Sequence, residues 1–295
     1  MPIDYTVYGA EGQGVSGVNE TSLQKARDPL RFIFPKNMAS NKDTARRLVN
    51  LIQQNDIDLH DAIAYATLKI HQPEVSDDEQ SKRRYFNDIQ INGHVEIARV
   101  LEDGPYVALH FRVTAHGKST INFHVYRFDN AGKLVEIWAN TQDELPARTD
   151  GTTMLNGATE ITDLDKTEQN RALTNAIYRV QVNGPAEQLP SFFIDGKMIQ
   201  HNVVMGNDLS GMGAFLQKLA DEGRTEKINS YELCVCEGNF SVTATHANFG
   251  PESMAFFDMQ RWENGKVVEH WDVVAPLPSP TDWKNSWGKF NFFSK

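Results

Sequence analysis

One sequence pattern near the C-terminus has a counterpart in the first half of the chain. Residues 259–271 read MQRWENGKVVEHW, and residues 125–138 read VYRFDNAGKLVEIW, with one extra residue at the turn of the earlier copy. Trp138 therefore corresponds to Trp271. Self-similarity at a fixed period is the signature of a repeated structural unit. We therefore expect two tandem copies of one domain rather than one large domain.

The length of the chain and the position of the repeats define the expected domains. At 295 residues, the chain can form two domains of ordinary size. A stretch of small and polar residues over 146–165 indicates a linker between them. The predicted order is an N-terminal extension over 1–40, a first domain over 41–145, this linker, a second domain over 166–280 and a C-terminal tail over 281–295.

Each half begins with helical patterns and continues with strand-like runs. In the first half, Ser40 followed by Asp43 is typical of a helix start, and a second helix is expected over residues 59–70. Four runs of β-forming residues, separated by turn residues, follow in each half. Helices followed by antiparallel strands predict an α+β fold. A curved sheet that wraps around its helices leaves a pocket between them, where ligands bind.

The second copy of the repeated stretch contains a candidate chemical site. Asn264 and Gly265 favour a tight two-residue turn, because both turn positions need a positive φ. Side chains alternate along a strand, so His270 and Asp272 share one face of the strand that follows, between valines. Ionisable groups in apolar surroundings have shifted pKa values and are candidates for function. The alternative is a half-exposed sheet face with a surface His and Asp.

Composition argues against some classes of partner. The formal net charge of −10 disfavours non-specific binding to nucleic acid and attraction to anionic membranes. No apolar run is long enough to span a bilayer, and the N-terminal residues lack the pattern of a signal peptide. Cys234 and Cys236 do not have the spacing of a zinc knuckle or a CxxC redox motif. We expect them to be reduced core residues, and the cytoplasm is the expected compartment.

These features together resemble a known family. The hairpin segment NGKVVEHWDVV, preceded by the segment IQHN around His201, is similar to the SnoaL-like polyketide cyclases. The similarity covers residues 166–280 well, covers 41–145 less well and does not include the tails. It implies the cone-shaped α+β fold that the cyclases share with ketosteroid isomerase, scytalone dehydratase and nuclear transport factor 2. The motif is more specific for the family than for any one reaction.

The resemblance also implies a reaction type and roles for particular residues. SnoaL-like cyclases close a ring by an intramolecular aldol reaction, without a metal or an organic cofactor. The resemblance implies that Asp272 is the acid/base, with His270, His201 and His246 as partners in the pocket. Such proton chemistry needs a positioned base and a donor that stabilises the enolate oxygen. Histidine or Asn202 can supply this donor.

Apolar spacing adds Phe215 and Phe257 to the expected walls of the pocket. The substrate-binding residues predicted from the sequence are therefore His201, Asn202, His246, Phe215 and Phe257, with no metal ligand among them. The expected ligand is a small apolar or keto compound. Ordinary core packing is the alternative role for each phenylalanine.

The first copy lacks the ionisable pair. In the aligned repeats, Ile137 stands opposite His270 and Ala139 stands opposite Asp272. We therefore expect the first domain to be a structural or ligand-holding partner and not a second active site. The other face of the hairpin strand is expected to carry Val267 and the repeated tryptophan, which would be costly to expose. The two domains are expected to pack as an internal pseudo-dimer, with a homodimer as an alternative.

Two functions are compatible with the sequence. One is a cofactor-independent enzyme that performs aldol cyclisation, isomerisation or dehydration on a small keto or polyketide-like substrate in the second domain. The other is a non-catalytic protein that binds a small apolar metabolite. The pair formed by Asp272 and His270 favours the enzyme, and the loss of this pair from the first copy favours the binding protein. A closed apolar cavity around Asp272 would favour the enzyme.

Overall fold

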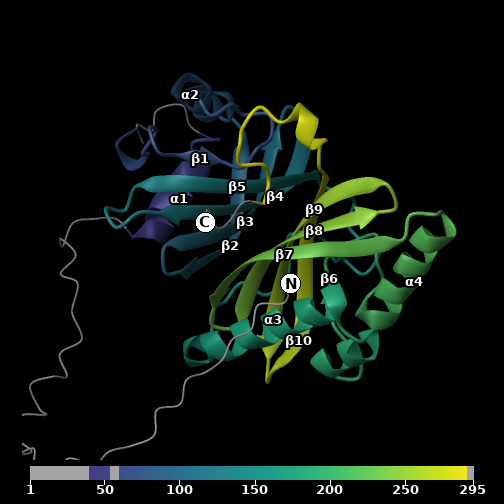
Figure 1. Cartoon of the computed structure of the whole chain (residues 1–295). Helices are drawn as coiled ribbons and strands as arrows, with labels where there is room; N and C mark the ends of the chain where they lie inside the picture. Colours follow the sequence, from purple (N-terminus) through teal and green to yellow (C-terminus); the bar gives the residue numbers. More distant parts are fainter. Residues whose placement is uncertain (1–39, 54–59, 291–295) are drawn as a thin grey trace, which may run out of the picture. The chain divides into compact units, whose positions relative to one another are not determined.

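The computed structural model describes residues 40–53 and 60–290 (Figure 1). The expected N-terminal extension therefore lies almost entirely outside the described residues. No helix in the described ranges is long and apolar enough to cross a membrane. The helices and strands, in chain order, are α1 (Asn41–Asn50), η2 (His60–Ala62), β1 (Lys69–Ile70), α2 (Glu79–Asp88), β2 (His94–Asp103), β3 (Tyr106–Ala115), β4 (Lys118–Phe128), β5 (Leu134–Asp143), η3 (Leu164–Lys166), α3 (Thr167–Asn183), η4 (Ala186–Phe192), β6 (Ile199–Gln200), α4 (Asp208–Asp221), β7 (Glu226–Glu237), β8 (Phe240–Phe249), β9 (Glu252–Glu263), β10 (Lys266–Pro276) and η5 (Pro280–Asp282).

The described strands form two five-stranded sheets with the same strand order. The first sheet has the order β1-β5-β4-β3-β2, and the second has the order β6-β10-β9-β8-β7 (Figure 1). In each sheet the short first strand is parallel to its neighbour, and the four long strands are antiparallel. The fold is therefore α+β, with helices ahead of a curved antiparallel sheet in each of two domains, as the sequence predicted. Trp138 on β5 and Trp271 on β10 occupy equivalent strands.

The helices of the first domain cover one face of its sheet. Ser40 caps α1 by accepting a hydrogen bond from the Asp43 backbone amide at 3.1 Å, and the apolar side of this helix is buried. The helix expected over residues 59–70 is found in the described part of that range only as the short 3-10 helix η2. Lys69 and Ile70 instead form β1, whose backbone pairs with Glu136 and Ile137 of β5. The backbone N–H and C=O groups of this segment form hydrogen bonds with the sheet. The helical spacing of its apolar residues therefore does not decide its structure.

A β-bulge changes the faces of the hairpin strand β10. Asn264 and Gly265 form the turn with φ values of 50° and 74°, as expected for a two-residue hairpin. Val267 pairs with Trp262, but the next aligned pair starts at Glu269, so that one residue is left between them. The expected position of Val267 beside the repeated tryptophan is therefore wrong. Val267 packs in the inner core of the second domain, because the extra residue reverses the alternation.

The two sheets pack against each other through their other faces. One hydrophobic cluster contains residues from β3, β4 and β5 together with residues from β7, β8, β9 and β10. Both repeated tryptophans lie in it and have no exposed surface. Asn140 of the first sheet donates hydrogen bonds to the backbone oxygens of Ala255 and Val273 in the second sheet, at 3.0 and 2.7 Å. Burial of a large apolar area and paired polar groups together stabilise this junction.

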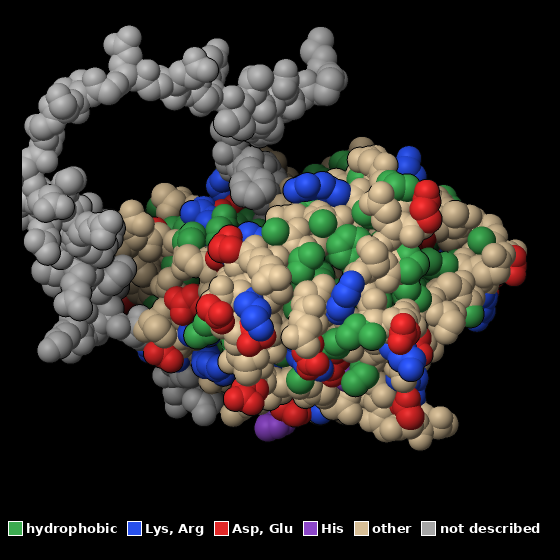
Figure 2. All heavy atoms as spheres, turned by 90° about the horizontal axis from the view of Figure 1, so that it is seen from below, with side chains coloured by type: hydrophobic (Ala, Val, Ile, Leu, Met, Phe, Trp, Pro, Cys, Tyr) green, Lys and Arg blue, Asp and Glu red, His purple; other side chains and the backbone are tan. Residues whose placement is uncertain are grey.

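The surface of the described part carries charges of both signs. On the face shown in Figure 2, Lys and Arg side chains lie among Asp and Glu side chains, with no continuous basic patch. This distribution agrees with the formal net charge of −10. A basic footprint of the kind that binds nucleic acid is not present on this face.

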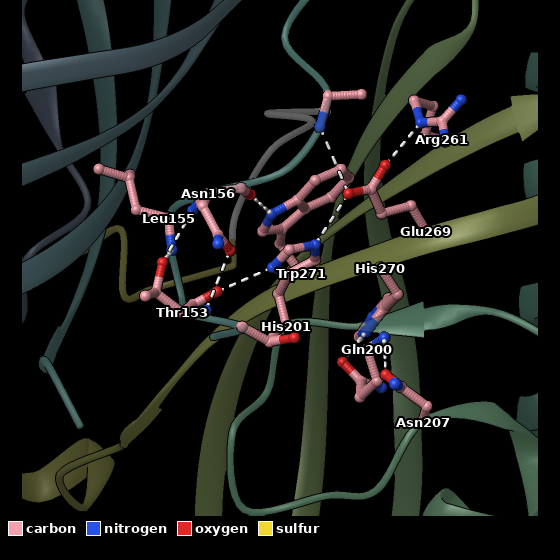
Figure 3. Close-up of polar contacts among 12 residues, drawn as sticks. Thr153, Leu155, Asn156, Gln200, His201, Asn207, Arg261, Glu269, His270 and Trp271 are labelled. Atoms are coloured by element: carbon pink, nitrogen blue, oxygen red, sulfur yellow. Dashed lines mark hydrogen bonds and ion pairs between the residues drawn. The ribbon is translucent and has the colours of Figure 1, made fainter. Parts of the chain in front are cut away.

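Each domain has a buried Arg–Glu–His–Trp motif that binds the backbone of a crossing segment. In the second domain, His201 stacks on Trp271 with ring centroids 4.6 Å apart, and its Nε2 lies 2.8 Å from Glu269 Oε1 (Figure 3). Arg261 Nε donates to Glu269 Oε2 at 2.7 Å. His201 Nδ1 lies 2.8 Å from the Thr153 backbone oxygen. The motif therefore fixes the segment that joins the two domains.

The first domain repeats this geometry with a different segment. His71 stacks on Trp138 at 4.6 Å, its Nε2 lies 2.9 Å from Glu136 Oε1, and Arg127 Nε donates to Glu136 Oε2 at 2.7 Å. Here the imidazole Nδ1 lies 2.9 Å from the backbone oxygen of Gly288 in the C-terminal tail. In both domains the two ring nitrogens face acceptors, so both contacts are satisfied when each nitrogen carries a proton.

Gly157 provides a test of how tightly the second motif holds the joining segment. A Cβ at Gly157 would lie 2.1 Å from Glu269 Oε1 and 2.8 Å from Trp271, whereas a Cβ at Gly151 meets nothing within 4 Å. Both glycines have positive φ, 101° and 84°, so both alanine variants carry backbone strain. We expect Gly157→Ala to lower the free energy of unfolding by about 2 kcal/mol or more beyond the effect of Gly151→Ala. Urea denaturation of both variants measures this difference, and equal losses would contradict the described contact.

Candidate active site

A cavity of about 100 Å³ lies in the second domain, lined by residues of its sheet and of the helices α3 and α4. Most of its walls are apolar. The apolar residues that line it are Ile177, Leu189, Phe193, Met198, Met205, Met212, Leu216, Ile228, Ala247, Phe256 and Val267. A concave, mostly apolar site with a few convergent polar groups is typical of small-molecule binding.

Asp258, His270 and Asp272 form the polar wall of this cavity. Asp258 on β9 pairs directly with Asp272 on β10, and His270 precedes Asp272 by two residues on the same face. Their ligand-type atoms lie within 4.8 Å of one another. This spacing would also suit a divalent cation, since carboxylate oxygens and imidazole nitrogens are common metal ligands. Asp258 is 7% exposed and Asp272 is 4% exposed, so both carboxyl groups are removed from bulk water.

The hydrogen bonds of Gln200 fix the orientation of the His270 ring. Gln200 Oε1 accepts a hydrogen bond from the Asn202 backbone amide at 2.9 Å, and the same oxygen lies 2.9 Å from His270 Nδ1 (Figure 3). His270 Nδ1 must therefore donate, and Nε2 faces Asp258 Oδ1 at 3.3 Å. Burial lowers the pKa of His270, but the hydrogen bond to Asp258 and the charges of Asp258 and Asp272 outweigh it, so this pKa lies above 6.5.

Asp272 has one oxygen held by the protein and one oxygen without a partner. Asn202 Nδ2 donates to Asp272 Oδ2 at 2.8 Å. Asp272 Oδ1 is buried and accepts no hydrogen bond from any described residue. Burial raises the pKa of Asp272 to about 6, with a further increase from Asp258, although His270 and the Asn202 hydrogen bond lower it. A buried carboxylate with a free oxygen and a pKa near neutrality is suited to general acid–base chemistry.

Other polar groups complete the cavity. Burial, together with Asp258 and Asp272, raises the pKa of Glu226 to about 7. The Tyr178 hydroxyl accepts hydrogen bonds from Thr243 Oγ1 and Gln260 Nε2 at 2.7 and 2.9 Å. Burial raises its pKa well above 10, so this hydroxyl stays neutral. Thr245 also lines the cavity, and its hydroxyl has no hydrogen-bond partner among the described residues.

The structure places His270 and Asp272 at the cavity and places His201 and His246 elsewhere. Gln200 reaches the His270 ring, so the next residue, His201, points to the opposite side and stacks on Trp271. On β8, Thr245 and Ala247 line the cavity, and His246 between them lies on the other face. There, His246 contacts Ser253 Oγ at 2.8 Å and Phe290 of the tail. The expectation that these two histidines line the cavity is therefore wrong, because strand alternation separates them from it.

Asn202, Phe215 and Phe257 also lie outside the set of residues that line the cavity. Asn202 acts on Asp272 through its side-chain amide and does not face the cavity. Phe215 packs beside the cluster that contains Phe256. Phe257 lies in the core between the two sheets and has no exposed surface. Asn202 is therefore a positioning residue for Asp272, and both phenylalanines are packing residues.

The β-bulge of the hairpin explains the omission of Asp258. In a regular hairpin through Asn264 and Gly265, Asp272 would stand opposite Phe257. The extra residue in β10 shifts the register by one, and Asp272 stands opposite Asp258 instead. Sequence reasoning also missed Glu226. The alternation of polar and apolar residues around Asp258 could have indicated its face, but the bulge has no clear sequence signal.

The corresponding position in the first domain carries no comparable acid pair. Register places Ala139 opposite His124, where the second domain has Asp272 opposite Asp258. Burial and the nearby Lys289 lower the pKa of His124 to about 3, so its ring stays neutral. Lys289 donates a hydrogen bond to the backbone oxygen of Ala139. The C-terminal tail thus contacts the first domain at Ala139, the position that corresponds to Asp272 in the second domain.

Comparisons with known proteins give likenesses to single-domain structures. No protein-family model matches the chain, and no curated protein matches it. A steroid delta-isomerase from Pseudomonas aeruginosa is 17% identical, with coverage of 39% of this chain and 85% of that one and a TM-score of 0.30. IdmH from Streptomyces antibioticus, a candidate polyketide cyclase, is 17% identical, with coverage of 36% and 91% and a TM-score of 0.31. An NTF2-like protein of unknown function from Cytophaga hutchinsonii is 14% identical, with coverage of 36% and 94% and a TM-score of 0.31. The strand order of the two sheets defines the fold independently of these likenesses.

The raised pKa of Asp272 predicts a pH-dependent gain in stability for Asp272→Asn. The carboxyl has a pKa of about 6 when folded and 3.8 as its ordinary value, so ionisation in the folded state costs stability as pH rises through this window. Asn keeps an acceptor for Asn202 and carries no charge. We expect Asp272→Asn to raise the free energy of unfolding by up to about 3 kcal/mol at about pH 8 and to have little effect below about pH 4. Urea denaturation at both pH values measures this, and a loss of stability at the higher pH would contradict it.

Proposed function

We propose that the second domain is a cofactor-independent acid/base catalyst, with Asp272 as the group that takes a proton from a small, largely apolar carbonyl compound. The observation that carries this proposal is Asp272, which lines the mostly apolar cavity and whose buried Oδ1 has no hydrogen-bond partner among the described residues. A buried carboxylate oxygen without a hydrogen bond lowers the stability of the folded protein. Such destabilising groups occur mainly at functional sites. Aldol cyclisation, isomerisation and dehydration all begin with this proton transfer.

The chemical step follows from the positions of the polar groups. Asp272 Oδ1 takes a proton from the carbon next to the carbonyl, the electrons of the C–H bond form a C=C bond, and the carbonyl π electrons move to oxygen. The unpartnered hydroxyl of Thr245 is available to donate to the enolate oxygen. Asn202 holds Asp272 through a hydrogen bond to Oδ2, and His270 contacts Asp258 beside it. Return of the proton to a different carbon gives isomerisation, and attack of the enolate on a second carbonyl gives cyclisation.

The first domain supports this site without repeating its chemistry. Arg99 of β2 lies over the Trp271 ring, 4.0 Å from its centroid, and donates to the backbone oxygens of the joining segment at Leu155, Asn156 and Ala158. These contacts fix the outer face of β10, whose inner face carries His270 and Asp272. A rigid supporting layer keeps catalytic groups in productive positions.

Hydrogen–deuterium exchange on a simple ketone tests the proposal without knowledge of the natural substrate. Proton NMR follows the loss of the signal next to the carbonyl of cyclohexanone in D₂O with the full chain. We expect the wild-type protein to accelerate this exchange and Asp272→Asn to reduce the acceleration by about a hundredfold or more, because a positioned base contributes about two to four orders of magnitude. The rate should rise with pH through about 6, as Asp272 ionises.

A matched control separates catalysis from a general charge effect. Asp143→Asn removes an exposed carboxylate at the end of β5 and should leave the exchange rate unchanged. Equal exchange by the wild type and Asp272→Asn would remove Asp272 from the mechanism. No acceleration over buffer, together with cyclohexanone binding, would favour a protein that binds apolar compounds without turnover.

A further inference from the structure

The cavity of the second domain has an excess of negative charge. Three carboxyl groups line it, those of Glu226, Asp258 and Asp272, together with the single imidazole of His270. Among the described residues that line the cavity, none is Lys or Arg. When all three acids are ionised, the site is therefore negative even with His270 protonated. Buried charges are normally paired, so this excess calls for a cation.

Two hydrogen-bond acceptors of residues that line the cavity have no donor among the described residues. Asp272 Oδ1 and Gln181 Oε1 are buried without a partner, and both residues line the cavity. The Glu226 side chain has no hydrogen-bond or ion-pair partner in the part of the chain that the structure describes. Asp272 is 4% exposed, so bulk water does not satisfy its free oxygen. A ligand that brings N–H donors would satisfy these acceptors.

The remaining walls suit an organic body and not a bare metal ion. Met198, Met205 and Met212, which we call the methionine wall, line the cavity, and so does Leu216. Thioether side chains adapt to irregular apolar ligands. A hard divalent cation keeps several waters and has no favourable contact with such a wall. Glu226 lies outside the trio of Asp258, His270 and Asp272 whose ligand atoms are close together, so a metal at the trio would leave it unpaired.

We propose that this cavity binds a small organic ammonium ion, with its cationic head at Glu226 and its apolar body against the methionine wall. This inference rests on the proposed function, which places the substrate in this cavity. It adds the class of substrate, an amine that also carries the reacting carbonyl group. Glu226 balances the charge and Asp272 acts on carbon, so the two acids have separate roles.

Isothermal titration calorimetry with benzylamine tests the proposal on the full chain. At about pH 8, benzylamine is an ammonium ion, and benzyl alcohol is a neutral compound of the same shape. We expect benzylamine to bind at least about tenfold more tightly than benzyl alcohol, equivalent to about 1.4 kcal/mol. Equal affinities for the two compounds would overturn the proposal.

A pair of variants on β7 tests the position of the charge. Glu226→Gln removes the proposed partner of the ammonium group and should abolish the preference for benzylamine. Glu232→Gln removes an acid from the same strand at a position that does not line the cavity, and it should leave the preference unchanged. Loss of the preference in both variants, or in neither, would contradict the role of Glu226.

The pH dependence of wild-type binding gives a test that needs no variant. Glu226 has a pKa of about 7, and the groups near it are Asp258, Asp272 and His270 from β9 and β10. The cation needs ionised carboxylates, so benzylamine affinity should rise severalfold from about pH 5.5 to about pH 8 while benzyl alcohol affinity stays constant. Affinity for benzylamine that does not rise would overturn the proposal.

Competition with a metal distinguishes the two kinds of cation. Mn²⁺ that binds tightly and displaces benzylamine would overturn the proposal in favour of a metal at Asp258, His270 and Asp272.

Failure of this inference and failure of the proposed function are separable. Binding of benzylamine requires no turnover, and deuterium exchange on cyclohexanone requires no ammonium group.

Discussion

The alternation of side chains along β10 connects the architecture of this protein to its chemistry. Glu269, Trp271 and Val273 point to one side, where they hold the joining segment and the first domain. His270 and Asp272 point to the other side, where they form the polar wall of the cavity. A shift of one residue would exchange the two sets and remove His270 and Asp272 from the cavity. The packing between sheets therefore fixes the position of the acids.

The two domains separate these roles. Both have the Arg–Glu–His–Trp motif on the face between the sheets, with nearly equal distances. Only the second domain has an acid pair on the inner face, because Ala139 and His124 occupy the corresponding positions of the first. The shared motif meets a structural need in both domains, since each must bind a crossing segment. The acid pair does not stabilise the fold in this way, because it leaves a buried oxygen of Asp272 without a hydrogen bond from the described residues.

The sequence predicted the α+β class, the strand pattern and the shared face of His270 and Asp272, because the repeat and the Asn264–Gly265 turn are local signals. It did not predict Asp258 as their neighbour. That contact depends on a one-residue bulge, which has no strong sequence signal. The histidines were misplaced for a related reason. The resemblance implied His246 and His201 as partners in the pocket, whereas the strand register decides which face each one occupies.

The pKa of Asp272 is the quantity on which the account of the site depends. Carbon-13 NMR of labelled aspartate carboxyl groups measures it directly, with Asp272→Asn to assign the signal. The account predicts one carboxyl that titrates near a pH of about 6, well above its ordinary 3.8. A titration of Asp272 near a pH of about 4 would show that the group is solvated and ordinary, and it would contradict the assignment of this cavity as an acid/base site.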